Sequence, residues 1–214
     1  MKKLLIFDVD GTLVDSLRIS YDVDSRIIRE LGGEVPDFKN YRKNLGEKDW
    51  SEFYSGFSVK DTALALSLYY NRVNRRKYRA IPGVKELLQK LADRPIAKTV
   101  ISINESSSCV ISKLRAAGLK NYFSTDSVHC GRDNKIRAIR EEYTKRNICP
   151  QDVLFVGDTA KDVREARAAG VRVAAISNKF SYNPEYLITQ ANPDYLFTDI
   201  SEIASLLGDK DESN

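Results

Sequence analysis

Four acidic side chains follow two short apolar runs of this 214-residue sequence. Two of them come directly after Leu4–Phe7 and two come after Val153–Val156; they are Asp8, Asp10, Asp158 and Asp162. If both runs are parallel strands of one sheet, their carboxyl ends meet at one edge, and the four carboxylates converge there. Carboxylates this close repel one another unless a cation lies between them. Oxygen ligands without His or Cys favour Mg²⁺, so the pattern predicts a magnesium site.

A helix cap is the alternative explanation for any one of these aspartates. Asp158 and Asp162 could each cap the start of a helix. A cap accounts for one such residue more readily than for all four, each beyond the end of an apolar run. The recurrence therefore favours a functional site over a set of unrelated caps.

The elements that must position these residues are strands alternating with helices. Short apolar runs of this kind suit strands buried on both faces, and their alternation with helices predicts a doubly wound parallel α/β sheet. The expected strands are Leu4–Phe7, Ile96–Ile101, Val153–Val156 and Val173–Ile176, with Tyr195–Phe197 at an edge. The expected helices are Val84–Leu91, Ser106–Ala117, Ile136–Lys145, Asp162–Ala169 and Ile200–Leu207.

The segment 16–79 has no apolar run of the buried-strand kind. Its periodicity indicates helices over Ser20–Leu31 and Lys60–Tyr78, joined by a loop. We therefore predict a small all-helical cap domain, residues 16–79, inserted into an α/β core made of residues 1–15 and 80–214.

The acidic pairs also carry a family resemblance. Phe7-Asp8-Val9-Asp10-Gly11-Thr12-Leu13 resembles the first motif of the haloacid dehalogenase superfamily, D-x-D-G-T. Gly157-Asp158-Thr159-Ala160-Lys161-Asp162 resembles the fourth motif, an acidic pair after a strand. Ser102 matches the second motif and Lys135 the third, in the order that the family shows. The resemblance covers nearly all of the predicted core and implies a phosphatase similar to phosphoglycolate phosphatases, with a type-one helical cap.

The resemblance implies the chemistry of the first two aspartates. Asp8 is expected to attack phosphorus and form an aspartyl-phosphate. Asp10 is expected to protonate the leaving alcohol and then to deprotonate the hydrolytic water. Dehalogenases of this superfamily lack an acid at the position of Asp10, so its presence favours phosphate esters.

The resemblance also implies how metal and phosphate are held. Mg²⁺ is expected on Asp8, on the backbone carbonyl of Asp10 and on Asp158, with Asp162 close by. The expected substrate contacts are Gly11, Thr12, Ser102, Asn104 and Lys135. Two alternatives stay open here: Asn104 could instead cap the next helix, and Arg132 and Arg137 are basic neighbours that compete with Lys135.

The predicted cap is expected to close over the site, with hinges near Val14–Ser16 and Arg79–Pro82. Its segment Tyr41–Trp50 contains basic residues and is expected to select the leaving group. Arg42 is the candidate for a contact with a carboxylate or second phosphate of the substrate, and a solvated loop is the alternative.

Composition excludes several other classes. A net charge of +4 with 42% hydrophobic and 30% charged residues is ordinary for a globular protein and does not indicate nucleic-acid binding. No stretch approaches the roughly 20 apolar residues that span a bilayer. Cys109, Cys130 and Cys149 are too scattered to suggest disulfides or zinc. We expect a cytoplasmic protein whose partner is a small molecule; the oligomeric state has no signature in the sequence.

The leading prediction is a magnesium-dependent phosphomonoester hydrolase that acts on a small phosphorylated metabolite. A sugar-phosphate mutase or phosphotransferase would share every core motif. A phosphonate hydrolase would need a cap lysine that forms a Schiff base. The candidates for it are Lys39, Lys43, Lys48 and Lys60. The non-enzyme alternative is a regulatory binding module on the same fold, which the presence of Asp8 and Asp158 disfavours.

Overall fold

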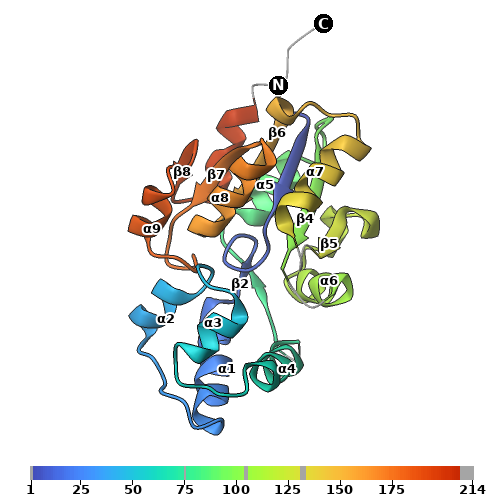
Figure 1. The fold of residues 1–214 in the computed structure, drawn as a ribbon. Helices are drawn as coiled ribbons and strands as arrows, with labels where there is room; N and C mark the ends of the chain where they lie inside the picture. The colour runs from blue at the N-terminus through green and yellow to red at the C-terminus, as the bar shows by residue number, and fades with distance from the viewer. Residues whose placement is uncertain (1, 75, 104–105, 131–133, 208–214) are drawn as a thin grey trace, which may run out of the picture.

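The computed structural model describes residues 2–74, 76–103, 106–130 and 134–207 (Figure 1). Its main sheet is parallel throughout the described chain, with the strand order β5-β4-β1-β6-β7-β8. The strands are β1 (Leu4–Phe7), β4 (Ala97–Ser102), β5 (Val128–Cys130), β6 (Val153–Gly157), β7 (Arg172–Ile176) and β8 (Tyr195–Phe197). The chain winds from β1 towards β5 and then towards β8, which confirms the predicted doubly wound fold.

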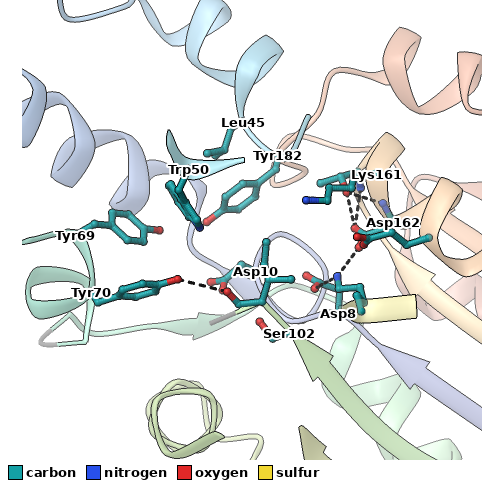
Figure 2. A pocket seen from close by; sticks show the side chains of 15 residues that line it. Asp8, Asp10, Leu45, Trp50, Tyr69, Tyr70, Ser102, Lys161, Asp162 and Tyr182 are labelled. Atoms are coloured by element: carbon teal, nitrogen blue, oxygen red, sulfur yellow. Dashed lines mark hydrogen bonds and ion pairs between the residues drawn. The ribbon is translucent and has the colours of Figure 1, made fainter. Parts of the chain in front are cut away.

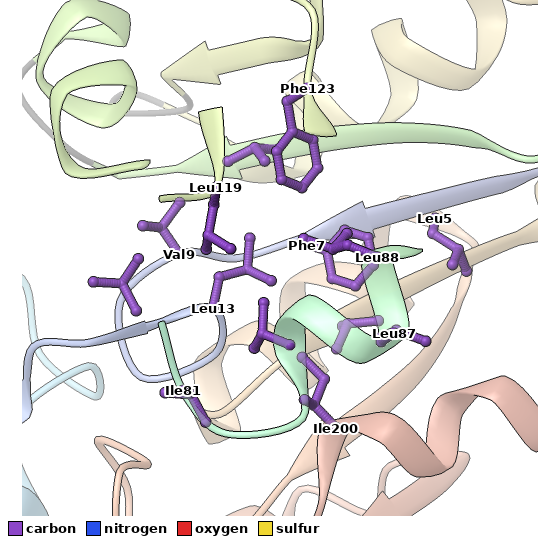
Figure 3. Close-up of a cluster of buried hydrophobic side chains, with 14 of the residues drawn as sticks. Leu5, Phe7, Val9, Leu13, Ile81, Leu87, Leu88, Leu119, Phe123 and Ile200 are labelled. Carbon is purple, nitrogen blue, oxygen red and sulfur yellow. The ribbon is translucent and has the colours of Figure 1, made fainter. Parts of the chain in front are cut away.

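Helices cover both faces of this sheet because its strands are apolar on both faces. Leu5 and Phe7 of β1 point into one hydrophobic cluster, and Leu4 and Ile6 point into the opposite one. The first cluster, drawn in part in Figure 3, includes residues of α5 (Val84–Lys90), α6 (Ser107–Ala116) and the 3₁₀ helix η4 (Ile200–Leu207). The second includes residues of α7 (Lys135–Lys145), α8 (Ala160–Ala169) and α9 (Glu185–Gln190).

Four helices between β1 and α5 pack around a third hydrophobic cluster at one end of the molecule (Figure 1). They are α1 (Leu17–Glu30), α2 (Phe38–Asn44), α3 (Trp50–Ser55) and α4 (Thr62–Val73). The helical character predicted for this segment is present, with two differences. Helices α2 and α3 occupy the stretch that was expected to be a loop, and the helix expected over Lys60–Tyr78 ends at Val73.

A short ribbon joins this helical group to the sheet. Strands β2 (Val14–Asp15) and β3 (Arg79–Ala80) pair antiparallel, with Val14 opposite Ala80. The chain therefore leaves the sheet and returns to it at the same place. None of the helices in the described part of the chain has the length and apolar character that crossing a bilayer requires.

Candidate active site

The carboxyl ends of β1 and β6 bring three acidic side chains together. Phe7 pairs with Val156 across the two strands, so Asp8 and Asp158 leave the sheet as neighbours. Asp162 comes from the first turn of α8, which follows β6 directly. Carboxylate oxygens of Asp8, Asp158 and Asp162 lie within 4.8 Å of one another, and all three residues are buried.

Burial, together with repulsion between the carboxylates, raises the pKa of two members of this cluster. Burial raises the pKa of Asp8 to about 7, with a further increase from Asp162 that Lys135 opposes. Burial, then the charges of Asp162 and Asp8, raise the pKa of Asp158 well above its usual range. This concentration of negative charge is costly unless a cation offsets it, and three buried carboxylates are the donor set of a hard divalent ion. The cluster therefore fits Mg²⁺.

Lys135 lies at the first position of α7 and closes one side of the cluster. Its helix begins at Asn134, whose side chain accepts a hydrogen bond from the backbone of Arg137. The Lys135 ammonium lies 2.8 Å from Asp8 Oδ1 and 2.6 Å from Asp162 Oδ1. Burial alone would lower the pKa of Lys135, but Asp162 and Asp8 outweigh it and raise that pKa. Lys135 is therefore held as a buried cation beside Asp8.

Gly11 and Thr12 shape the turn after β1 around Asp158. Gly11 has a φ of +83°, and a Cβ at this position would come within 2.2 Å of Asp158 Oδ2. Thr12 is fully buried, and its hydroxyl donates a hydrogen bond of 2.8 Å to Asp158 Oδ1. Thr12 thus orients Asp158, and the absence of a side chain at Gly11 lets the turn pass close to the same carboxylate.

The remaining predicted residues fall into three groups. Ser102 ends β4 and lines the same cavity as Asp8 and Asp10. Asn104 and the basic neighbour Arg132 lie outside the described residues. Arg42 does not line this cavity: its guanidinium donates to the backbone carbonyls of Ser181, at 2.6 Å, and Asn183, at 3.1 Å.

Residues 5–176 match the sequence model of the family described as haloacid dehalogenase-like hydrolase. The chain belongs to this family. The resemblance seen in the sequence motifs is confirmed.

Curated relatives of this haloacid dehalogenase-like hydrolase align over almost its whole length. A phosphoglycolate phosphatase from Haemophilus influenzae is 27% identical over 226 residues, which cover 96% of this chain and 98% of the relative. A pyrophosphatase from Oceanobacillus iheyensis is 24% identical, covering 97% of each. The relatives confirm the predicted class of enzyme, a phosphatase of this family.

Solved structures show the same fold. A haloacid dehalogenase-like protein from Agrobacterium tumefaciens superposes with a TM-score of 0.79 at 24% identity, covering 97% of this chain and 98% of that one. A hydrolase of the same family from Streptococcus pneumoniae gives a TM-score of 0.78 at 20% identity, covering 97% and 99%. Both alignments include the helical group as well as the sheet, because they span nearly the whole chain.

The cavity of this hydrolase lies between the sheet edge and the helical group. It encloses about 80 Å³ beside Asp8, Asp10, Ser102 and Lys135. In Figure 2, aromatic side chains gather on the side away from Asp162. The cavity-lining residues from the helical group are Leu45, Gly46, Trp50, Tyr69 and Tyr70. The acidic side chains and the opposite wall of the cavity thus come from different parts of the fold.

The segment 181–183, which we call the clasp, connects the helical group to the buried acidic cluster. The backbone N–H of Tyr182 donates to Asp158 Oδ2 at 2.6 Å. The Tyr182 hydroxyl lies 2.7 Å from that of Ser20 on α1. Asn183 donates to the backbone carbonyl of Leu45 at 2.7 Å and accepts from the backbone N–H of Ala160 at 2.9 Å. The clasp therefore contacts α1, the end of α2 and the start of α8 at once.

Lys113 is a site residue that the motifs do not reveal. It lies on α6, is 3% exposed, and places its ammonium 2.8 Å from each carboxylate oxygen of Asp10. The sequence does contain a signal for it. Val110, Lys113, Leu114 and Ala117 occupy positions i, i+3, i+4 and i+7, so a lysine stands within the apolar stripe of the helix.

Proposed function

We propose that this hydrolase is a magnesium-dependent phosphomonoesterase that acts on a small phosphorylated metabolite through an aspartyl-phosphate on Asp8. The observation that carries the proposal is the buried cluster of Asp8, Asp158 and Asp162, with Lys135 at its edge. Its three carboxylates and one ammonium suit the binding of a divalent cation and, through it, of a phosphoryl group.

Asp8 is the proposed nucleophile because it is the cluster carboxylate that lines the cavity from the turn after β1. Lys135 fixes Asp8 Oδ1, which orients the carboxylate towards an incoming phosphorus atom. The Asp8 carboxylate must be ionised to attack, and a cation beside it favours that form over the neutral one. The phosphoester bond to the leaving oxygen breaks as the Asp8–phosphorus bond forms.

Asp10 and Ser102 are proposed to act on the two sides of the reacting phosphoryl group. Asp10 protonates the departing alkoxide and then takes a proton from the water that hydrolyses the aspartyl-phosphate. Ser102, at the end of β4, donates a hydrogen bond to a phosphoryl oxygen. Both side chains line the cavity with Asp8, which supports these roles.

The metal ligands proposed are Asp8, Asp158 and the backbone carbonyl of Asp10, with Asp162 close by. When bound, Mg²⁺ neutralises charge on the phosphate and orients it for attack. Thr12 and the backbone of Tyr182 each donate to Asp158, which holds its carboxylate in place for this role.

We also propose that residues 16–79 form a cap domain on a core of residues 1–15 and 80–214. The separate hydrophobic cluster of the helical group and the β2–β3 ribbon at its base support this division. The cap supplies the cavity wall that excludes bulk water, and the ribbon is the proposed hinge.

A phosphate ester whose leaving group is itself anionic is the proposed substrate. Phosphoglycolate and pyrophosphate, named in the relatives, both carry a second anionic group. Within the part of the chain that the structure describes, Lys161 lines the cavity without a hydrogen bond or ion pair to another residue.

No cap lysine lines this cavity in the described chain, so no observation favours the phosphonate hydrolase.

Release of inorganic phosphate tests this proposal. Wild type, Asp8→Asn and the exposed control Asp93→Asn are each assayed on phosphoglycolate, pyrophosphate and sugar phosphates, with Mg²⁺ or with a chelator. We expect wild type and the control variant to release phosphate only when Mg²⁺ is present. In Asp8→Asn the rate of release should fall by more than about 1,000-fold. Folded wild-type protein that releases no phosphate from any substrate, or undiminished release by Asp8→Asn, would contradict it.

A further inference from the structure

The contact between Lys113 and Asp10 joins a core helix to the turn that follows β1. Lys113 reaches Asp10 from α6 with both oxygens at 2.8 Å, while Asp10 is 19% exposed and lines the cavity. The Lys113 ammonium also lies 5.4 Å from the centre of the Tyr78 ring. The buried ammonium of Lys113 therefore contacts Asp10, which also lines the cavity.

Stability alone does not explain a lysine at this position. Burying an ammonium costs free energy that a single ion pair offsets poorly, and apolar replacements for buried pairs are often neutral or stabilising. The neighbouring positions of the α6 stripe, Val110 and Leu114, are apolar and fully buried. An apolar residue would therefore suit the packing at position 113. The presence of a lysine there is better explained by its contact with Asp10.

We propose that Lys113 is a positioning residue: it fixes the Asp10 carboxylate in the orientation from which Asp10 exchanges a proton with the leaving group. This inference rests on the proposed function, in which Asp10 is the acid and base. Two hydrogen bonds from one ammonium to both oxygens fix the rotation of the carboxylate as well as its place. Proton transfer requires that orientation, because it is efficient only within hydrogen-bonding reach.

The inference predicts a dependence on the leaving group. An alkoxide such as that of phosphoglycolate needs a proton as it departs, whereas the acetate of acetyl phosphate does not. Loss of Lys113 should therefore lower kcat/KM for phosphoglycolate by about 10–100-fold and for acetyl phosphate much less. A lysine with only a structural role would affect the two substrates equally.

The variants for this test are Lys113→Met, which keeps the length of the side chain without its charge, and Lys113→Arg, which keeps the charge. Arg115→Met on the exposed side of α6 is the matched control. We expect the selective loss in Lys113→Met, partial recovery in Lys113→Arg and no change in the control. Equal losses on both substrates, or none, would overturn the inference.

A double-mutant cycle with Asp10→Asn tests whether Lys113 acts through Asp10. If it does, adding Lys113→Met to Asp10→Asn should cause little further loss in kcat/KM for phosphoglycolate. Losses that multiply would overturn the inference. The same four proteins are compared by thermal unfolding, in which a coupled pair also gives non-additive shifts. If the unfolding shifts are non-additive but wild type releases no phosphate, the contact between Lys113 and Asp10 is present and the proposed function is wrong.

Discussion

Lys161 lies where the cavity meets a second hollow of about 220 Å³. It lines both spaces together with Leu45, Gly46, Trp50, Tyr70 and Ile103. The other lysine of the inner cavity, Lys135, is already bound to two carboxylates. Lys161 is therefore placed to meet a charge on the distal part of a substrate.

We expect Lys161→Gln to weaken the binding of phosphoglycolate selectively. Loss of one hydrogen bond to a charged group corresponds to about 1.5–3 kcal/mol, or roughly 10–100-fold in KM. A neutral alkyl phosphate should keep its KM, and Lys90→Gln on the exposed face of α5 serves as the control variant. Steady-state kinetics measure both substrates; an equal rise in KM for both would remove Lys161 from substrate selection.

At the residue scale, the apolar runs predict the side chains that follow strands and the family motif adds Lys135 from a helix, whereas contacts made by distant loops are missed. The positions of Asp8 and Asp158 follow from two apolar runs because adjacent parallel strands end at one edge. Tyr182 contacts Asp158 from a loop after β7, and no local pattern indicates that approach. Arg42 shows the reverse: its type suits an anionic substrate, but the carbonyls of the clasp bind it.

At the scale of elements, short helices are where pattern reasoning is weakest. Helices α2 and α3 are too brief to repeat an apolar stripe, and each depends on a capping aspartate. Asp37 accepts from the backbone of Asn40, and Asp49 accepts from that of Glu52. Aromatic packing between α3 and its neighbours, such as Trp50 against Tyr69, adds tertiary contacts that propensity does not include.

A buried acid contacts three helices of the helical group. Asp24 of α1 is fully buried and accepts hydrogen bonds from the hydroxyls of Tyr41 on α2, at 2.7 Å, and Tyr54 on α3, at 2.6 Å. Burial raises the pKa of Asp24 to about 7, although the two hydroxyls lower it. The folded protein therefore holds a proton on Asp24 more tightly than the unfolded chain does.

This shift predicts how stability depends on pH. Because the pKa is raised on folding, the stabilisation from Asp24 is complete below about pH 4 and is lost as the pH rises through about 7. A shift from 3.8 to about 7 corresponds to at most about 4 kcal/mol, at 1.36 kcal/mol per pKa unit. Asp24→Asn removes this titration, so the unfolding free energy of wild type should fall relative to the variant between pH 4 and pH 8. A difference that stays constant with pH in chemical denaturation would contradict the assignment.

At the scale of the whole molecule, the cluster of Asp8, Asp158 and Asp162 joins elements from the beginning and the last third of the chain. Asp8 follows β1, Asp158 follows β6, and Asp162 lies on α8. A cation that binds at this cluster has no such site in the unfolded chain, so on the proposed function it would stabilise the fold by mass action. The unfolding temperature should therefore report on metal binding directly.

We expect saturating Mg²⁺ to raise the unfolding temperature of wild type by roughly 5–10 °C, from about 2.7 kcal/mol at 100 times the dissociation constant. Asp158→Asn should lose most of this rise because a central ligand is gone, and Asp126→Asn should keep it. Differential scanning calorimetry with Mg²⁺ or with a chelator measures the shift. A rise of the same size in Asp158→Asn would place the bound ion elsewhere.

The doubly wound sheet is predictable at this scale because strands buried on both faces appear as apolar runs. Strand β5 was not predicted, because His129 interrupts its short sequence and leaves no apolar run. The β2–β3 ribbon has two residues in each strand, too few for any periodicity to show.

That ribbon has a consequence for how such a chain can evolve. Because Val14 and Ala80 are paired, the chain between them is a single inserted segment whose two ends lie side by side. The strands that precede the acidic residues, β1 and β6, pair with each other outside this segment, and β1 also pairs there with β4. On the proposed function, changes confined to this segment would alter substrate selection without displacing the residues that follow β1 and β6.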